Sequence, residues 1–495
     1  DAVASVSGGS WFAVELIYSE RFLRLIEDMA ASPAEAAAAY RTRWTEPLLS
    51  VLKTDSAFAQ DIARVLQLLR GAGSAQDFLA LDYLWQEGFT WTTFCNTLFE
   101  KTAGIDSSVT LGSPVSPWAG GKAWLVAHTR VTPSAQTGMR AHILEQAMGR
   151  WWQWWRPARA ITLRVGASPG LSTFTPATYS YVLGSAKTPA PVPYVSTSAL
   201  PQDARLEYRA SVKSRCPCAN AKYKARARVG DFSDLVAGAA DLPVISCAAA
   251  SSAAFGNVVL GELPTLRMDA IGGDLAMWQG AGPAGESFSR ASALVSEMRR
   301  GDDVNQAAVD RLADELVQPV IDAGFVDNSG IGCAVSAGAV EVVAFLANDA
   351  SNAPKFVVSL FQGAPQSIFE QTTEWMESEY ARFPTLRICA GAKFLTAISV
   401  GTLDVTTAQS SLWGTCRGSR VTLHLVSVAS TVTAGYLENM YDYDVLAQEV
   451  IETIVAPENA GLVQNTVMPW LLGPAQKAEQ AGGESTQSPQ DTRSE

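Results

Sequence analysis

The stretch ASVSGGSWF, residues 4–12, places a serine among small residues, follows it with two glycines and then begins a bulky apolar run. One interpretation is an ordinary flexible turn, which serine and glycine suit well. The other is a nucleophile turn between a strand and a helix, with Ser7 as the nucleophile. Such a turn needs small residues on both sides of the serine, here Ser5 and Gly9. In that interpretation Gly8 supplies a backbone N–H to a developing oxyanion, at the positive end of the helix that follows.

Composition excludes several classes of protein. The 495-residue chain is 47% hydrophobic and 17% charged, which predicts a sizeable buried core. Its net charge of -12 argues against nucleic acid as the main partner. No apolar run reaches the roughly 18 residues that a membrane span needs, and no signal-like segment is visible. We therefore expect a protein of the cytoplasm or of the membrane periphery.

Cysteine usage points away from disulfides and metals. The seven cysteines are odd in number and scattered, which favours a reducing compartment over a disulfide framework. Cys216 and Cys218 form a Cys-Pro-Cys triplet, but no second pair stands at zinc-ligand spacing. We therefore expect no metal and no other cofactor.

Apolar periodicity predicts the order of elements. Residues 10–30 have helical spacing, and residues 40–105 look mostly helical. Residues 106–230 are rich in Ser, Thr, Pro and Gly, which indicates a loop-rich inserted cap region. The tail from residue 474 to 495 is polar and predicted to be disordered. Further predicted elements are strands at PVISC (243–247), 357–361, 387–401 and 419–430, a helix ending at Pro319, and a last helix after Tyr436. Helices alternating with apolar strands favour an α/β fold.

A serine nucleophile needs a base, and histidine is the usual one. The chain has three histidines, of which only His424 lies far enough along for the Ser–Asp–His order of an α/β-hydrolase. His424 alternates with Leu423 and Leu425 in a predicted strand, so we expect it to face solvent. A Ser–His–Asp triad that uses His424 nevertheless remains an alternative.

The second candidate base lies in VIDAGFVDNSGIG, residues 320–332. Asp, Asn and Gly suit a turn after a strand or helix. Alternatively, Asp322 is an aspartate fixed at a strand end, able to take the proton of Ser7. Asp327 and Asn328 are expected to shape the turn rather than to react.

Three segments resemble one family, in the same order along the chain. SVSGGSW (5–11) resembles the nucleophile turn of the cytosolic phospholipase A2 and fungal lysophospholipase (phospholipase B) group, within the patatin-like superfamily. DAGFVDNSGI (322–331) resembles that superfamily's Asp-x-Gly motif, although Ala323 stands where many members have glycine. LPVISCAAASSAAFG (242–256) resembles the small-residue segment between the two motifs.

The resemblance implies a patatin-like α/β catalytic domain over residues 1–473, a central sheet flanked by helices with residues 106–230 as its cap. It also implies acyl-ester hydrolysis of phospholipids or lysophospholipids through an acyl-serine, by a Ser7–Asp322 dyad without histidine. The oxyanion site would lie at Gly8 and Gly9. The family's glycine-rich oxyanion loop precedes the serine, and the chain begins six residues before Ser7. We therefore expect the C-terminal part of a longer protein, with weak or absent catalysis from this chain alone.

Two segments are candidates for contact with a membrane surface. GRWWQWWRPAR (149–159) carries four tryptophans among arginines, which suits a lipid interface. The stripe through Leu144, Met148 and the tryptophans instead favours a helix packed in the core. VKSRCPCANAKYKARARVG (212–230) is interpreted as a solvated basic loop, with docking to anionic lipid as the other interpretation. An inactive lipid-binding or scaffolding homologue is therefore a further alternative.

Overall fold

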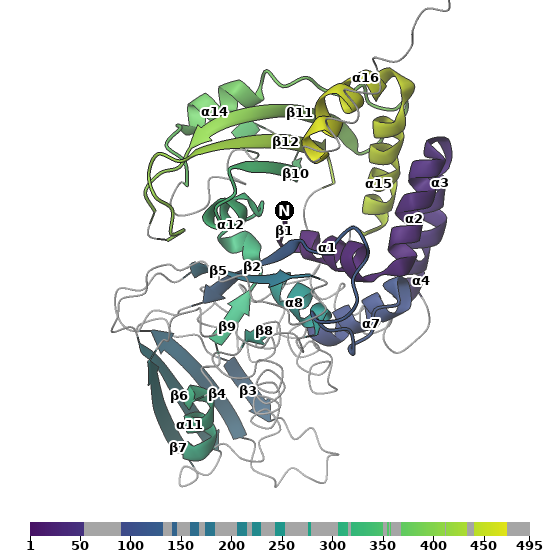
Figure 1. Ribbon diagram of the computed structural model, residues 1–495. Helices are drawn as coiled ribbons and strands as arrows, with labels where there is room; N and C mark the ends of the chain where they lie inside the picture. The colour runs from purple at the N-terminus through teal and green to yellow at the C-terminus, as the bar shows by residue number, and fades with distance from the viewer. Residues whose placement is uncertain are drawn as a thin grey trace, which may run out of the picture.

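The computed structural model describes residues 1–53, 91–131, 141–145, 159–167, 174–183, 205–214, 220–228, 243–252, 276–278, 305–314, 318–349, 354–355, 357, 368–410, 412–432 and 440–472. In this part of the chain, helices and strands are mixed, and the strands form three sheets (Figure 1). No helix of this part is long and apolar enough to cross a membrane. The tryptophans at 151–155, the Cys-Pro-Cys triplet at 216–218 and the tail at 474–495 lie outside the described residues.

The N-terminal strand leads directly into two helices. β1 (Ala2–Ser5) is followed by α1 (Gly8–Tyr18) and α2 (Glu20–Ala31). The sequence predicts one helix here, but the chain breaks at Ser19, whose backbone is extended. The Ser19 side chain accepts a hydrogen bond from the amide of Phe22 and so caps α2, as serine does at many helix starts. Its hydroxyl also donates to the carbonyl of Ala103, 2.7 Å away, which fixes the break to a second segment.

The helices that follow pack around a first hydrophobic core. They are η1 (Pro33–Glu35), α3 (Ala36–Tyr40), η2 (Arg41–Thr45), α4 (Glu46–Lys53) and α7 (Trp91–Ala103). Val14 and Ile17 of α1 are fully buried in this core, together with Trp124. Burial of such side chains is the main favourable term in folding, so this core fixes α1 in place.

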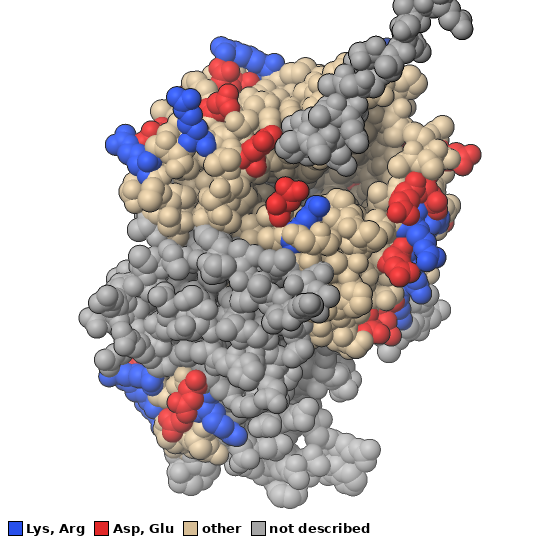
Figure 2. Space-filling view, viewed as in Figure 1, with Lys and Arg blue, Asp and Glu red and all other residues tan. Residues whose placement is uncertain are grey.

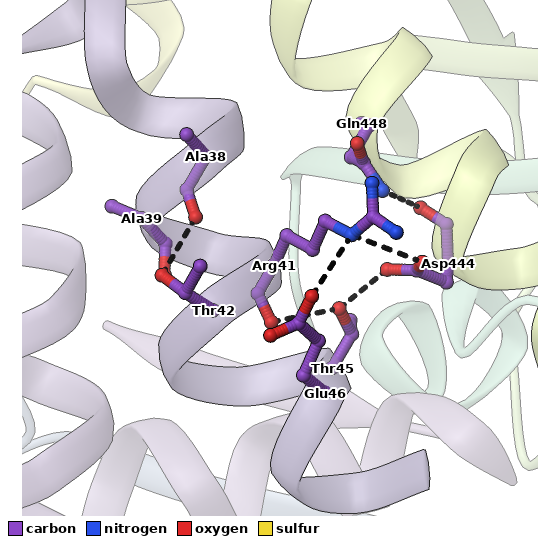
Figure 3. Close-up of polar contacts among 8 residues, drawn as sticks. All are labelled: Ala38, Ala39, Arg41, Thr42, Thr45, Glu46, Asp444 and Gln448. Carbon is purple, nitrogen blue, oxygen red and sulfur yellow. Dashed lines mark hydrogen bonds and ion pairs between the residues drawn. The ribbon is translucent and has the colours of Figure 1, made fainter.

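A polar junction joins these helices to the C-terminal helix α15 (Met440–Val455). Arg41 lies between Glu46, 3.3 Å away, and the buried Asp444, 3.8 Å away (Figure 3). The hydroxyl of Thr45 donates to the same Asp444 carboxylate. Segments from opposite ends of the sequence are therefore held side by side.

The first sheet has five strands. Its members besides β1 are β2 (Ala123–Val131), β5 (Phe174–Val182), β8 (Ala276–Trp278) and β9 (Gln318–Ile321). β5 pairs with β2 along its whole length, so β1 and β9 share the opposite edge of β2. β1 runs parallel to β2 and β9 runs antiparallel to it. The two short strands therefore run toward one another along that edge, and their carboxyl ends meet.

The range predicted to be an inserted cap contributes to two sheets. β2 and β5 belong to the sheet of β1, so the predicted boundaries at 106 and 230 do not coincide with a boundary between sheets. The other strands of this range form a four-stranded antiparallel sheet: β3 (Ala141–Glu145), β4 (Arg159–Ala167), β6 (Arg205–Ser214) and β7 (Ala221–Arg228). α11 (Gln306–Asp314), which confirms the predicted helix before Pro319, packs against β6 and β7.

The described parts of the basic segment, residues 212–214 and 221–228, are strands rather than loop, which corrects the interpretation of residues 212–230 for those parts. Much of it is β7, which pairs with β6. Arg209, Lys224 and Arg226 surround the carboxylate of Glu207, which forms ion pairs with all three. Figure 2 shows blue and red side chains together at the position of β6 and β7 in Figure 1. The acid offsets part of the positive charge, so this surface is less basic than the sequence indicates.

The third sheet lies near the C-terminus and is covered on both faces. Its order is β10 (Glu341–Asp349), β12 (Arg420–Ser430), β11 (Leu395–Thr406). One face packs on α12 (Ile331–Ser336) and α14 (Thr373–Tyr380), and the other on α15 and the segment after it. That segment comprises η10 (Pro457–Asn459), α16 (Ala460–Leu462), η11 (Val463–Val467) and α17 (Met468–Leu471). β11, β12 and α15 confirm the last two predicted strands and the last helix; β10 was not predicted.

Two local predictions are wrong. PVISC does not form a strand: residues from Val244 to Ser251 form helix α8, all of it buried. A short apolar run fits a buried helix as well as a buried strand, and the alanines that follow favour the helix. Leu144 lies in strand β3, so the predicted helical stripe does not begin there.

Candidate active site

The sheet topology brings the two predicted reactive residues together. Ser5 at the end of β1 is paired with Val126, and Ile321 at the end of β9 is paired with Thr129 of the same strand. Ser7 lies two residues after the end of β1, and Asp322 is the first residue after the end of β9. The hydroxyl of Ser7 donates a hydrogen bond to Oδ2 of Asp322 at 2.7 Å, across 315 positions of sequence. The expected position of Asp322 at a strand end is confirmed.

Ser7 has an unusual backbone. Its φ of 49° and ψ of -123° make it the one non-glycine residue with positive φ in the described part of the chain. Such a conformation costs on the order of 1–3 kcal/mol and persists only where the surroundings impose it. Here the amide of Gly9 donates to the carbonyl of Val6 at 2.7 Å, and the amide of Ser10 donates to that of Ser7 at 2.9 Å. The turn is therefore tight and strained, not flexible.

Asp322 is held rigidly on its other oxygen. The amide of Gly324 donates to Oδ1 at 2.7 Å, within the one-turn helix η7 (Ala323–Phe325). A Cβ on Gly324 would lie 2.8 Å from Oδ1 of Asn328 and 3.1 Å from Oδ1 of Asp322, so a larger residue would displace the Asn328 side chain and crowd the Asp322 carboxylate. Ala323 is buried in a small apolar cluster with Ala127 and Cys333, where its methyl group fills space.

Burial tunes the acidity of Asp322. The carboxyl is 6% exposed, and desolvation raises its pKa from 3.8 to about 6, although the hydrogen bonds from Gly324 and Ser7 act in the opposite direction. Desolvation disfavours the charged form of an acid, which makes it a stronger base. A carboxylate with a pKa near neutrality is well matched to proton transfer at physiological pH.

The two glycines after Ser7 differ in what they can bind. Gly8 is exposed and is the first residue of α1, a position whose amide has no acceptor within a helix. Among the described residues no acceptor takes the amide hydrogen of Gly8, so it is available to an oxyanion. The amide of Gly9 is engaged with Val6, and this glycine serves the turn.

Asp327 shapes the turn, as expected. Asp327 is 4% exposed and accepts hydrogen bonds from the amides of Ser329, Gly330 and Cys333 and from the Ser329 hydroxyl. These bonds satisfy amides at the start of α12, which would otherwise lack partners. Gly330 has φ of 76° and packs against Val6, so α12 is set directly beside the Ser7 turn.

His424 is buried, so the expectation that it faces solvent is wrong. It is 8% exposed, and its ring stacks on Trp470 at 4.7 Å between centroids. Nδ1 lies 2.9 Å from the hydroxyl of Thr402, and Nε2 lies 3.2 Å from the carboxylate of Glu341. Side chains alternate between the two faces of β12, so His424 lies on the face opposite to Leu423 and Leu425. The segment after α15, which includes Trp470, covers that face. None of the contacts recorded for His424 involves Ser7.

One contact of the site was not anticipated from the sequence. The amide of Ser7 donates to the hydroxyl oxygen of Ser251 at 3.1 Å, and Ser251 is the last residue of α8. The signal for it was a pair of hydroxyl side chains at the end of the run CAAASS, where every neighbour is small and apolar.

The described residues contain no group of His, Cys, Asp or Glu side chains that could hold a metal ion. No family model, no curated protein and no solved structure matches this chain.

Proposed function

We propose that this protein is a serine acyl hydrolase in which Ser7 is the nucleophile and Asp322 the general base. The observation that carries the proposal is the 2.7 Å hydrogen bond from the Ser7 hydroxyl to Asp322, made from a strained turn at the start of a helix. A nucleophile within reach of a base that a third group orients is the arrangement that activates serine. Here the amide of Gly324 orients the base.

In the first half-reaction, Ser7 Oγ attacks the ester carbonyl carbon while its proton passes to Asp322. The tetrahedral oxyanion accepts the hydrogen bond of the Gly8 amide at the positive end of α1. The C–O bond to the alcohol then breaks, and the alcohol leaves with the proton from Asp322. In the second half-reaction, Asp322 takes a proton from water, the hydroxide attacks the acyl-serine, and the acid is released as Ser7 recovers its proton.

We infer a phospholipid or lysophospholipid substrate and a patatin-type core from the sequence resemblance of the three motifs. A surface feature agrees with an apolar acyl group. Phe12 lies one helical turn after Gly8 on the same side of α1, and its ring is 52% exposed. An acyl chain bound at Gly8 would find apolar surface there.

The first test is reaction of the chain with a fluorophosphonate probe, followed by mapping of the labelled peptide by mass spectrometry. We expect phosphonylation of Ser7 in the wild type, because this reaction needs an activated serine but no completed ester turnover, and none in Ser7→Ala. Labelling of a different serine, or no labelling of the folded protein, would contradict the proposal. Vesicle binding without release of fatty acid from phosphatidylcholine or lysophosphatidylcholine would instead support the lipid-binding alternative.

The Ser–His–Asp alternative is separated by His424→Gln, which keeps a polar planar group beside Trp470. The dyad predicts an unchanged labelling rate at Ser7. A triad predicts a loss of several orders of magnitude, on the order of 10⁴-fold. A loss of that size in a variant with wild-type thermal stability would replace Asp322 by His424 as the base.

A further inference from the structure

We infer that Ser251 is a positioning residue, whose hydroxyl holds Ser7 in its strained conformation and so sets the reactivity of the nucleophile. The inference rests on the proposed function for its catalytic consequence. The positioning of Ser7 is inferred from the contacts of Ser251 alone. Ser251 belongs to α8, whereas Ser7 and Asp322 follow β1 and β9.

The Ser251 hydroxyl is placed to act as a fixed acceptor. It is fully buried, and it donates its own proton to the carbonyl of Ala127 at 2.7 Å. That bond leaves its oxygen lone pairs to face the amide of Ser7, 3.1 Å away. Ala127 belongs to β2, between the residues that pair with β1 and those that pair with β9. Ser251 therefore ties the Ser7 turn to the strand that aligns both halves of the site.

A buried hydroxyl cluster lies on the other side of this acceptor. The hydroxyl of Ser10 lies 2.8 Å from that of Ser251 and donates to Ser5 Oγ at 3.0 Å. The indole N–H of Trp124 donates to the same Ser5 oxygen at 3.0 Å. Ser5 and Ser10 flank the Ser7 turn in sequence, so the turn is anchored before, at and after the nucleophile.

Loss of the Ser251 hydroxyl would leave the partly buried amide of Ser7 without its acceptor, beside a fully buried position. An unmade bond of this kind is costly, and the turn is already strained, so the backbone would relax. The Ser7 hydroxyl would then leave its alignment with Asp322. Misplacement of a reacting group by about 1 Å can reduce a rate by about 100-fold.

Ser252 offers a matched control. It is the next residue, is also buried, and also bonds to α1, since its oxygen accepts from the indole of Trp11 at 2.8 Å. Its hydroxyl donates to the carbonyl of Ala248, so neither of these two bonds involves Ser7. Ser252→Ala therefore removes a comparable buried hydroxyl without touching the turn.

The experiment compares wild type, Ser251→Ala and Ser252→Ala by two measurements on the full chain. The first is hydrogen–deuterium exchange of the peptide that contains the Ser7 amide. The second is the fluorophosphonate labelling rate at Ser7 as a function of probe concentration. We expect faster exchange at Ser7 and about 10- to 100-fold lower maximal labelling in Ser251→Ala alone. The half-saturating probe concentration should stay unchanged, because positioning affects reaction rather than binding.

Unchanged exchange and labelling in Ser251→Ala would overturn the inference, as would equal effects in Ser252→Ala. If wild type is not labelled, the proposed function fails and the catalytic role of Ser251 with it, while the exchange data still decide whether Ser251 holds Ser7. If Ser251→Ala does not fold, Ser251→Cys keeps the side-chain size but supplies only a weak acceptor. Ser251→Cys should likewise show faster exchange at Ser7 and a lower maximal labelling rate.

Discussion

Asp322 and Asp327 belong to one short segment, and both are buried, yet they have different hydrogen-bond partners. Asp327 accepts all of its recorded hydrogen bonds from donors of its own segment, at the start of α12. Asp322 shares its two oxygens between the nearby Gly324 amide and a hydroxyl from the far end of the chain. Burial raises the pKa of both carboxyls. A raised pKa therefore does not identify the proposed base, and neither does a hydroxyl partner, since Ser329 donates to Asp327; the strained backbone of the serine that donates to Asp322 does.

The substitution Asp322→Asn should separate the two aspartates most clearly. The amide keeps the size of the side chain but cannot take a proton from Ser7, so we expect labelling of Ser7 to fall by about 10²- to 10⁴-fold. The fold should be retained. Measurement of labelling rates at equal folded concentration checks this. A rate within the wild-type range would remove Asp322 from the mechanism.

Asp327→Ala should act on stability instead. It leaves the amides of Ser329, Gly330 and Cys333 without an acceptor, so we expect the free energy of unfolding to fall by about 3 kcal/mol or more. Urea denaturation followed by tryptophan fluorescence measures it. A loss below about 1 kcal/mol would show that α12 does not depend on this cap.

The pH dependence of stability separates the two acids further. The pKa of Asp322 is about 6 in the folded protein and its ordinary value is 3.8, so the folded state binds this proton more tightly than the unfolded state. Its contribution to stability is complete below the unfolded pKa and is lost as pH rises through the folded pKa. From about pH 4 to pH 7 the loss is about 2 kcal/mol.

Asp322→Asn should abolish that part of the dependence, while the contribution of Asp327 remains in both proteins and cancels in the difference. Denaturation curves of wild type and variant at the two pH values give the difference directly. Parallel pH profiles for the two proteins would show that Asp322 is not perturbed by burial.

The smallest expected effect concerns the strain at Ser7. Ser7→Ala and Ser7→Gly both remove the hydroxyl, but only glycine adopts a φ of 49° without steric cost. We expect Ser7→Gly to be more stable than Ser7→Ala by about 1 kcal/mol. Thermal denaturation of the pair measures it. Equal stability would mean that the turn relaxes once its contact with Asp322 is lost.

The contact between Ser7 and Asp322 could be predicted from the sequence, whereas parts of the fold around it could not. Ser7 and Asp322 were found because each stands in a local pattern of small residues and turn formers. Helix α8 was missed because an apolar run as short as PVISC has no distinguishing period. The burial of His424 was missed because alternation in a strand reveals two faces but not what covers the second one. The role of Ser251 was missed because Ser7, its partner, lies 244 positions away in the sequence.

The meeting of β1 and β9 at one edge of β2 has a consequence for synthesis of the protein. Ser7 leaves the ribosome 315 residues before Asp322, which directly follows β9. Contacts of such long sequence separation form late, because the loop between them must be closed first. The nascent chain would therefore carry a Ser7 hydroxyl without its carboxylate partner until β9 docks, and under the proposed function labelling of Ser7 would report completion of the fold.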